Sequence, residues 1–261
     1  MPDASNPVLC VRNLCVDIQV ASGTLHAVRD TSFEVSRGQT LAIVGESGCG
    51  KTMTALSIMR LLPRRAALFA EELTLDGISL AELSEREISD LRGNQIGMIF
   101  QDPMTSLNPV YRVGDQLEEI YLRHGKGTRV EARERAYHLL DRVGITNPKA
   151  RLSQYPHELS GGLRQRMMIA MALMCEPALI IADEPTTALD VTVQAQIMGL
   201  LAELRREFNT AMILITHDLG VVARAADHVA VMYAGRIIET GTATDVFSSP
   251  AHPYTRGLID C

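Results

Sequence analysis

The stretch GESGCGKT, residues 45–52, follows the apolar run LAIV at 41–44 and decides the fold. It has the form G-x-x-x-x-G-K-[ST], in which a strand runs into a phosphate-cradling loop and then into a helix. Glycine adopts positive φ without steric cost, so the loop can fold around an anion with its N–H groups inward. The predicted ligand-binding residues are Gly45, Glu46, Ser47, Gly48, Cys49, Gly50, Lys51 and Thr52.

This motif predicts nucleoside triphosphate chemistry. Lys51 would reach the β- and γ-phosphates, and the Thr52 hydroxyl would ligate Mg²⁺. The competing interpretation is a flexible glycine-rich turn with a surface lysine, which the preceding apolar run disfavours. Cys49 lies inside an electropositive loop, where the pKa of a thiol should fall and its reactivity rise. The simpler interpretation, a small residue that fits the turn, is favoured for Cys49.

Composition narrows the class of protein. The 261 residues make one large domain or two small ones, and 46% hydrophobic with 21% charged residues is typical of soluble globular chains. The longest uninterrupted apolar stretch, 167–175, is about half of what a bilayer-spanning helix needs. No basic-then-apolar signal segment precedes Val8. We therefore expect a cytosolic protein unless something else holds it at a membrane.

Charge and cysteine content exclude further classes. The net charge is −6 and no run of adjacent basic residues is longer than a pair, whereas a nucleic-acid binder should show a basic stripe. The five cysteines are odd in number and lack C-x-x-C spacing. They are interpreted as reduced thiols, without a disulfide framework or a zinc site.

Hydrophobic periodicity predicts the order of elements. The first forty residues alternate as antiparallel strands do and end in a turn at 36–39. The capping pair Thr128 and Glu131 predicts the start of a helix. Alternating strands and helices imply a largely parallel sheet with the phosphate loop at a carboxyl end. The other predicted elements are strands at 41–44, 73–75, 96–100, 179–182, 212–216 and 229–233, helices at 51–62, 193–208 and 219–226, and a helical insertion at about 102–159.

A second cluster of chemistry follows the apolar strand at 178–182. Asp183 is placed to hold the water shell of Mg²⁺, which prefers carboxylate and phosphate oxygens. Glu184 is placed to orient and deprotonate an attacking water. The alternative is that the acidic pair only caps the next turn, since Pro185 follows.

The segment LSGG at 159–162 predicts another helix start. Ser160 is a good N-cap, and Gly161 with Gly162 exposes backbone N–H groups to an approaching ligand. This would be a second anion site. Taken alone, an ordinary N-cap is the more economical interpretation.

The order of these motifs is specific. The phosphate loop, Gln101, LSGG, Asp183-Glu184, ALD at 188–190 and His217 follow one another in an order that resembles the nucleotide-binding subunit of an ABC transporter. The resemblance covers essentially the whole chain. The sequence around the motifs is similar to that of the oligopeptide/dipeptide/nickel importer branch. The similar stretches are IFQDPMTSLNP at 99–109, YPHE at 155–158, ADEPTTALD at 182–190 and HPYT at 252–255.

The resemblance implies an α/β fold, namely a P-loop NTPase cassette over residues 1–261. Its parts would be a RecA-like core with an N-terminal antiparallel β subdomain, at 1–101 and 165–261, and a helical signature subdomain at 102–164. The cofactors implied are ATP and Mg²⁺. The metal ligands implied are Thr52, Gln101 and Asp183.

The resemblance also implies a mechanism that uses two cassettes. Glu184 would be the general base, and His217 would contact the γ-phosphate and this glutamate. Gln101 would touch Mg²⁺ or the lytic water and relay the state of the site to the membrane subunit. The signature residues Ser160, Gly161 and Gly162 would face a nucleotide on the partner chain, and Asp190 would couple the two sites. Taken alone, His217 and Gln101 would be ordinary polar residues at strand ends.

The implied partners are a second cassette, forming a homo- or heterodimer, two transmembrane permease subunits and, indirectly, an extracytoplasmic binding protein. The location would be peripheral, at the cytoplasmic face of the inner membrane. Oligopeptides or dipeptides are the expected cargo, with nickel or another small solute as the alternative. A cassette acting on nucleic acid is disfavoured by the charge, and a non-hydrolysing switch by Glu184 and His217.

Three departures from the family pattern are visible. Leu163 stands where many members have glutamine, although this branch commonly carries an apolar residue there. The stretch 17–21 lacks the aromatic residue that usually stacks on adenine, so Ile18 or Val20 is expected to pack the base. Members of this branch normally continue beyond the segment matching HPYT, often with a cysteine-bearing tail, so this sequence is either part of a truncated or split cassette or that of a short member.

Overall fold

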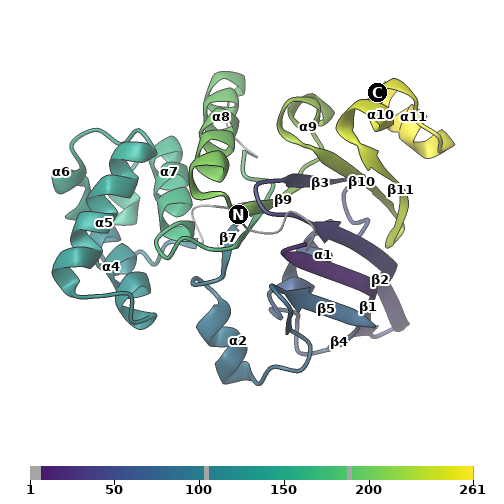
Figure 1. Cartoon of the computed structure of the whole chain (residues 1–261), viewed down its shortest axis with the longest axis horizontal. Coiled ribbons are helices and arrows are strands. Elements are labelled where there is room, and N and C mark those ends of the chain that lie inside the picture. The colour runs from purple at the N-terminus through teal and green to yellow at the C-terminus, as the bar shows by residue number, and fades with distance from the viewer. Residues whose placement is uncertain (1–6, 103–105, 187–189, 261) are drawn as a thin grey trace. The chain divides into compact units, whose positions relative to one another are not determined.

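The computed structural model describes residues 7–102, 106–186 and 190–260 (Figure 1). The chain divides into two compact units. The first unit comprises Met1–Ser89 and Asn209–Cys261, and the second comprises Asp90–Phe208. Helix α2 (Glu85–Leu91) spans the point in the sequence where the first unit gives way to the second.

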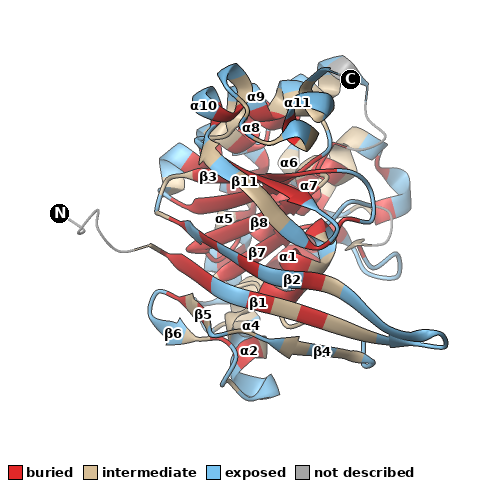
Figure 2. Cartoon of the chain, turned by 90° about the vertical axis from the view of Figure 1, so that its right-hand side faces the viewer, coloured by how far each residue is buried: buried red, intermediate tan, exposed pale blue. Residues whose placement is uncertain are grey.

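The first unit contains an antiparallel sheet, as the N-terminal alternation predicts. Strand β1 (Leu9–Val20) pairs with β2 (Gly23–Val35), with β4 (Ala66–Phe69) and with β5 (Glu72–Leu75). The short β6 (Ile78–Ser79) continues the sheet on β5. Buried and exposed positions alternate along β1 and β2 because one face of this sheet packs inward (Figure 2).

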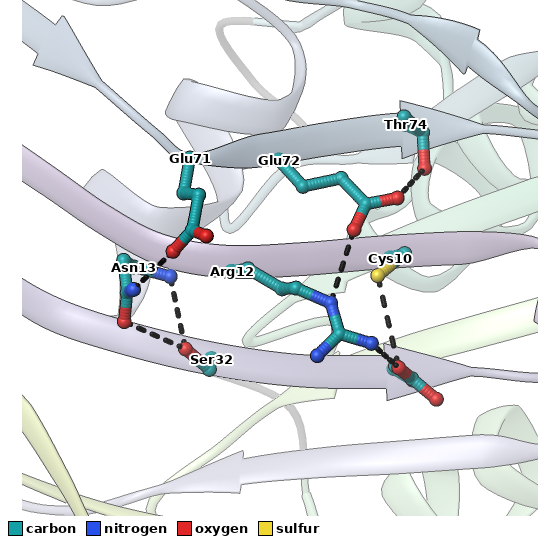
Figure 3. Close-up of polar contacts among 8 residues, drawn as sticks. Cys10, Arg12, Asn13, Ser32, Glu71, Glu72 and Thr74 are labelled. Carbon is teal, nitrogen blue, oxygen red and sulfur yellow. Dashed lines mark hydrogen bonds and ion pairs between the residues drawn. The ribbon is translucent and has the colours of Figure 1, made fainter.

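Polar side chains cross the strands of this antiparallel sheet (Figure 3). Arg12 donates to Glu34 and to Glu72, each at 3.0 Å, and so bridges three strands. The side-chain amide of Asn13 donates to Glu71, the residue that precedes β5. Each exposed pair contributes little to stability, so this network is best understood as one that fixes strand register.

The first unit also contains parallel strands. Strand β10 (His228–Tyr233) pairs in parallel with β3 (Thr40–Val44), and β3 pairs in parallel with β9 (Ala211–Ile215). Strand β11 (Arg236–Thr242) adds to β10 in the antiparallel sense. Every residue of β3 is buried, as a strand covered on both faces requires. The phosphate loop follows its carboxyl end, as predicted.

Four helices of the first unit complete this part of the chain. They are α1 (Lys51–Ile58), α9 (Leu219–Ala225), α10 (Ala243–Ser248) and α11 (Pro253–Asp260). The predicted extension of α1 to residue 62 is wrong. Arg60 adopts a φ of +51°, and Leu61 N–H donates to Leu56 C=O at 2.8 Å. This is a Schellman ending, which stops the helix before Pro63 is reached.

The second unit combines two parallel strands with helices. Strand β7 (Ile96–Ile99) pairs with β8 (Leu179–Asp183), and both are buried throughout. The helices are α4 (Val113–Arg123), α5 (Arg129–Arg142), α6 (Pro148–Leu152), the 3₁₀ turn η1 (Pro156–Glu158), α7 (Gly161–Ala172) and α8 (Val191–Phe208).

Two sets of side chains organise the helical part of the second unit. Thr128 and Glu131 form the predicted capping box at the start of α5. The buried Glu118 of α4 is paired with Arg133, at 2.7 Å, and with Arg129, at 3.4 Å, both on α5. These contacts join α4 to α5.

The compact units differ in extent from the expected subdomains. The second unit includes β7, β8 and α8 together with the helical block. The division at 102–164 therefore stays a prediction. In the parts of the chain that the structure describes, no helix has the length and low polarity needed to span a bilayer.

Candidate nucleotide site

The phosphate loop shows why glycine is required at two of its positions. Gly45 has φ +150°, and a Cβ there would lie 2.1 Å from the Met232 carbonyl oxygen. Gly50, which caps α1, has φ +112°, and a Cβ there would lie 2.5 Å from the Ala27 carbonyl oxygen. No other residue fits either position without displacing backbone, so the loop closes tightly against β10 and β2.

Lys51 is buried and turned into the same loop. Its Nζ donates to the carbonyl oxygens of Gly45 and Glu46, both at 2.8 Å. Cys49 is 7% exposed, and its Sγ lies 3.8 Å from this Nζ. A thiol so covered lacks the access that reactive cysteines have, which supports the small-residue interpretation of Cys49. Thr52 is exposed on the first turn of α1.

His217 lies in the first unit, in the turn between β9 and α9. Its side chain is exposed. The turn is fixed on both sides, because Asp218 N–H donates to Thr216 Oγ1 at 3.1 Å and Asp218 Oδ1 accepts from Val221 N–H at 3.1 Å. Asp218 is thus the N-cap of α9, and the cap holds the histidine at the carboxyl end of β9.

The second unit brings two predicted catalytic residues together. Gln101 Nε2 donates to Glu184 Oε2 at 2.9 Å. Glu184 has φ +45°, a left-handed conformation that costs free energy in a residue other than glycine. Asp183, the last residue of β8, is 4% exposed. The Glu184 carboxylate and the Gln101 amide therefore meet next to the buried Asp183, at the end of β8.

Gln165 of α7 supports the segment that follows Glu184. It is 2% exposed, and its Nε2 donates to the Pro185 carbonyl oxygen at 2.5 Å. This side chain ties α7 to the segment that follows β8. Sequence reasoning missed this contact, because a glutamine beside two arginines at the start of a helix has the pattern of a solvated face.

The signature glycines have a different setting from those of the phosphate loop. Ser160 caps α7 by accepting from Leu163 N–H at 3.4 Å. A Cβ at Gly161 would meet nothing within 4 Å, and one at Gly162 would meet only a Val193 methyl at 3.9 Å. Neither packing nor a positive φ within the described chain explains these two glycines.

Asp190 is the N-cap of α8, where it accepts from Val193 N–H at 2.9 Å. The preceding residues of the ALD motif, Ala188 and Leu189, lie outside the described residues, as do residues 103–105 of the stretch at 99–109. The known contacts of Ser160 and Asp190 are thus with their own helices.

The hairpin of β1 and β2 carries the aliphatic residues expected to pack a base. Ile18 pairs with Leu25 and Val20 with Gly23, so the three aliphatic side chains share one face of the hairpin. Val20 is 42% exposed and Leu25 is 52% exposed. Leu25 was not anticipated, because only strand register places it opposite Ile18.

Comparison with known proteins decides the family. A family model described as ABC transporter matches residues 28–187, more than half of the chain. The chain belongs to the ABC transporter family. This confirms the resemblance and the predicted α/β cassette fold.

The relatives place the chain within one branch of that family. It is 55% identical over 253 residues to the dipeptide transport ATP-binding protein DppD of Bacillus subtilis, covering 97% of this chain and 76% of that protein. It is 54% identical over 259 residues to the oligopeptide transport ATP-binding protein OppD of Salmonella typhimurium, covering 99% and 77%.

A solved structure shares the fold. The ATP-binding cassette MJ0796, in a dimeric post-hydrolysis state bound to ADP and Pi, matches with a TM-score of 0.79 and 26% identity. The match covers 90% of this chain and 98% of that one.

Proposed function

We propose that this chain is the ATP-hydrolysing subunit of an importer for oligopeptides or dipeptides. The carrying observation is Glu184, held in a left-handed conformation at the end of β8 and hydrogen-bonded to Gln101. Such a carboxylate suits a general base that orients and deprotonates water. The family assignment and the peptide-transporter relatives agree with this chemistry.

The phosphate-binding role falls to residues 45–52. The loop is already folded around Lys51, whose ammonium group would exchange the carbonyls of Gly45 and Glu46 for phosphate oxygens. His217, exposed at the end of β9, would contact the γ-phosphate. An imidazole there adds a hydrogen-bond donor where charge develops on the transferred group.

Three of the predicted residues carry donor groups that suit a magnesium ion. Asp183 is a buried carboxylate at a strand end, and Thr52 and Gln101 supply neutral oxygens, a hard donor set of the kind Mg²⁺ prefers. Bound with the phosphates, the ion would neutralise the charge that develops during transfer. Asp183, Thr52 and Gln101 would hold it.

A second cassette would complete the site. A Cβ at Gly161 would meet nothing within 4 Å and one at Gly162 only a Val193 methyl, and we assign the two glycines to the approach of a group from another chain. Ser160 and these two glycines would receive the γ-phosphate of the partner's nucleotide at a helix N-terminus. Asp190 would couple the two sites from the start of α8.

The remaining partners follow from the branch. We expect two permease subunits, an extracytoplasmic binding protein acting through them, and a peripheral location at the cytoplasmic face of the inner membrane. Ile18, Val20 and Leu25 would pack the base by dispersion contacts, which distinguish adenine from other purines less well than hydrogen bonds do.

Glu184→Gln tests the assignment of the base. ATP turnover should fall by at least about 10²-fold, because the amide cannot accept the proton of water. Equilibrium binding of ATP should be retained. Glu176→Gln is the matched control, since Glu176 also has a positive φ, +54°, and its known partner is Arg135. Unchanged turnover in Glu184→Gln would refute this role.

Uptake in cells tests the cargo. Cells lacking this gene should regain uptake of a labelled tripeptide with the wild type and not with Glu184→Gln. If the wild type restores nickel uptake and leaves tripeptide uptake at background, the ATPase assignment stands and the peptide cargo is wrong.

A further inference from the structure

The HPYT segment at 252–255 is used by none of the roles above, yet it reaches the phosphate loop. Tyr254, on the first turn of α11, accepts a hydrogen bond at its hydroxyl oxygen from Glu46 N–H at 3.2 Å. Both residues belong to the first unit. A residue more than 200 positions downstream thus holds a backbone amide of the loop that wraps around phosphate.

The segment that carries Tyr254 is itself firmly held. The Glu239 carboxylate on β11 accepts from Ala251 N–H at 2.7 Å and from His252 N–H at 3.0 Å. Burial alone would raise the pKa of Glu239, but hydrogen bonding outweighs it and holds that pKa below its usual value. His252 Nδ1 accepts from Tyr254 N–H at 3.0 Å. These bonds fix the position of Tyr254 independently of the phosphate loop.

The Tyr254 ring and hydroxyl have separate contacts. The ring packs against Tyr233 at the end of β10, with centroids 4.6 Å apart and planes at 49°. The hydroxyl faces the loop. Burial raises the pKa of Tyr254, so the oxygen accepts the Glu46 hydrogen bond as part of a neutral phenol at physiological pH.

A second bond supports the far side of the loop. Gly235 N–H, in the turn after β10, donates to the Cys49 carbonyl oxygen at 2.9 Å. The loop is thus fixed at Glu46 by α11 and at Cys49 by the turn between β10 and β11. Both supports come from the C-terminal part of the sequence.

We propose that Tyr254 is a positioning residue for nucleotide binding, its hydroxyl fixing the Glu46 peptide so that the phosphate loop is preorganised for ATP. The inference rests on the proposed function as an ATPase. Without the bond, the loop would visit conformations that do not bind phosphate. Apparent affinity falls in proportion to the fraction of the loop that is competent to bind.

The test compares two hydroxyl deletions in the full chain. Tyr254→Phe removes the hydroxyl and keeps the ring contact. Tyr233→Phe is the matched control, since the Tyr233 hydroxyl makes no hydrogen bond within the described residues. We expect Tyr254→Phe to bind the ATP analogue AMP-PNP about 3- to 10-fold more weakly, the usual effect of one hydrogen bond. The KM for ATP should rise similarly, with kcat and Tm unchanged.

Two outcomes would overturn the inference. One is unchanged affinity in Tyr254→Phe; the other is an affinity loss accompanied by a drop in Tm of the kind that Tyr254→Leu should cause, which would mean a packing role alone. Amide hydrogen exchange separates this inference from the proposed function. If the wild type binds no AMP-PNP, the proposed function fails. Faster exchange at 45–52 in Tyr254→Phe, and not in Tyr233→Phe, would still support the hydroxyl bond, and equal exchange would refute it.

Discussion

Two helices of this chain, α1 and α7, begin with glycines in predicted anion sites, and they differ in what requires the glycine. Gly45 and Gly50, in the loop that leads into α1, have positive φ. A Cβ at either position would lie within 2.5 Å of a backbone carbonyl oxygen, that of Met232 or that of Ala27. Gly161 and Gly162, at the start of α7, have neither constraint.

The difference indicates which site is complete within one chain. Contacts within the same chain require the glycines of the phosphate loop, because β2 and β10 pack against it. The start of α7 has the geometry of an ordinary capped helix, with Ser160 as the N-cap. Nothing in the described residues requires its glycines, and we propose that a second cassette approaches them there.

The largest effect should come from Gly45→Ala. A methyl group 2.1 Å from the Met232 oxygen forces β10 or the loop to move. Strain and overpacking together should cost about 2–4 kcal/mol of unfolding free energy. Binding of AMP-PNP should become undetectable, measured by calorimetry beside thermal unfolding.

Gly48→Ala is the control within the same loop. Gly48 has φ +80°, but a Cβ there meets nothing within 4 Å. Only the left-handed conformation is penalised, by about 1–2 kcal/mol. Equal damage from Gly45→Ala and Gly48→Ala would show that packing against Met232 is not what requires Gly45.

Gly161→Ala should lower ATP turnover without changing nucleotide affinity. Within one chain the added methyl is unopposed, so AMP-PNP affinity should be unchanged and the unfolding free energy should rise by about 0.4–1 kcal/mol. At concentrations that favour paired cassettes, turnover should fall about tenfold, the effect of about 1.4 kcal/mol. Full turnover at such concentrations would argue against a partner phosphate at this helix start.

The smallest effects should come from two capping substitutions. Thr128→Ala and Ser160→Ala each remove an N-cap, which costs about 1 kcal/mol. Thr128→Ala should lower only stability, whereas Ser160→Ala should also lower turnover. Thermal unfolding and ATPase assays on both variants test this. Equal turnover in Thr128→Ala and Ser160→Ala would contradict a role of Ser160 beyond capping.

The capping box adds a pH dependence. Hydrogen bonds from the Thr128 backbone N–H and hydroxyl hold the pKa of Glu131 below its usual value. A carboxylate with a lowered folded-state pKa stabilises the fold above its unfolded pKa, and this contribution is lost as pH falls through the folded value. The part of this contribution that comes from the Thr128 hydroxyl is lost in Thr128→Ala, so the Tm difference between wild type and Thr128→Ala should shrink below about pH 4.3, the unfolded-state pKa of glutamate. A difference that stays constant there would mean that the Thr128 hydroxyl does not bond the Glu131 carboxylate.

Local patterns predicted much of the fold. Apolar runs of four or five residues identified β3, β7, β8, β9 and β10 because buried parallel strands are apolar on both faces. The end of α1 was missed, because Pro63 was expected to stop it. The Schellman ending at Arg60 carries no such signal in its residue types.

The sequence by itself determined the family, the phosphate loop, the acidic pair at 183–184 and the serine-glycine-glycine helix start, because each depends on residue types at fixed short spacing. Only the tertiary structure decided that Gln101 meets Glu184, that Gln165 holds Pro185 and that Tyr254 reaches Glu46. These pairs are separated by 20 to 208 positions. Their contact depends on how strands and helices pack, and no local spacing records that.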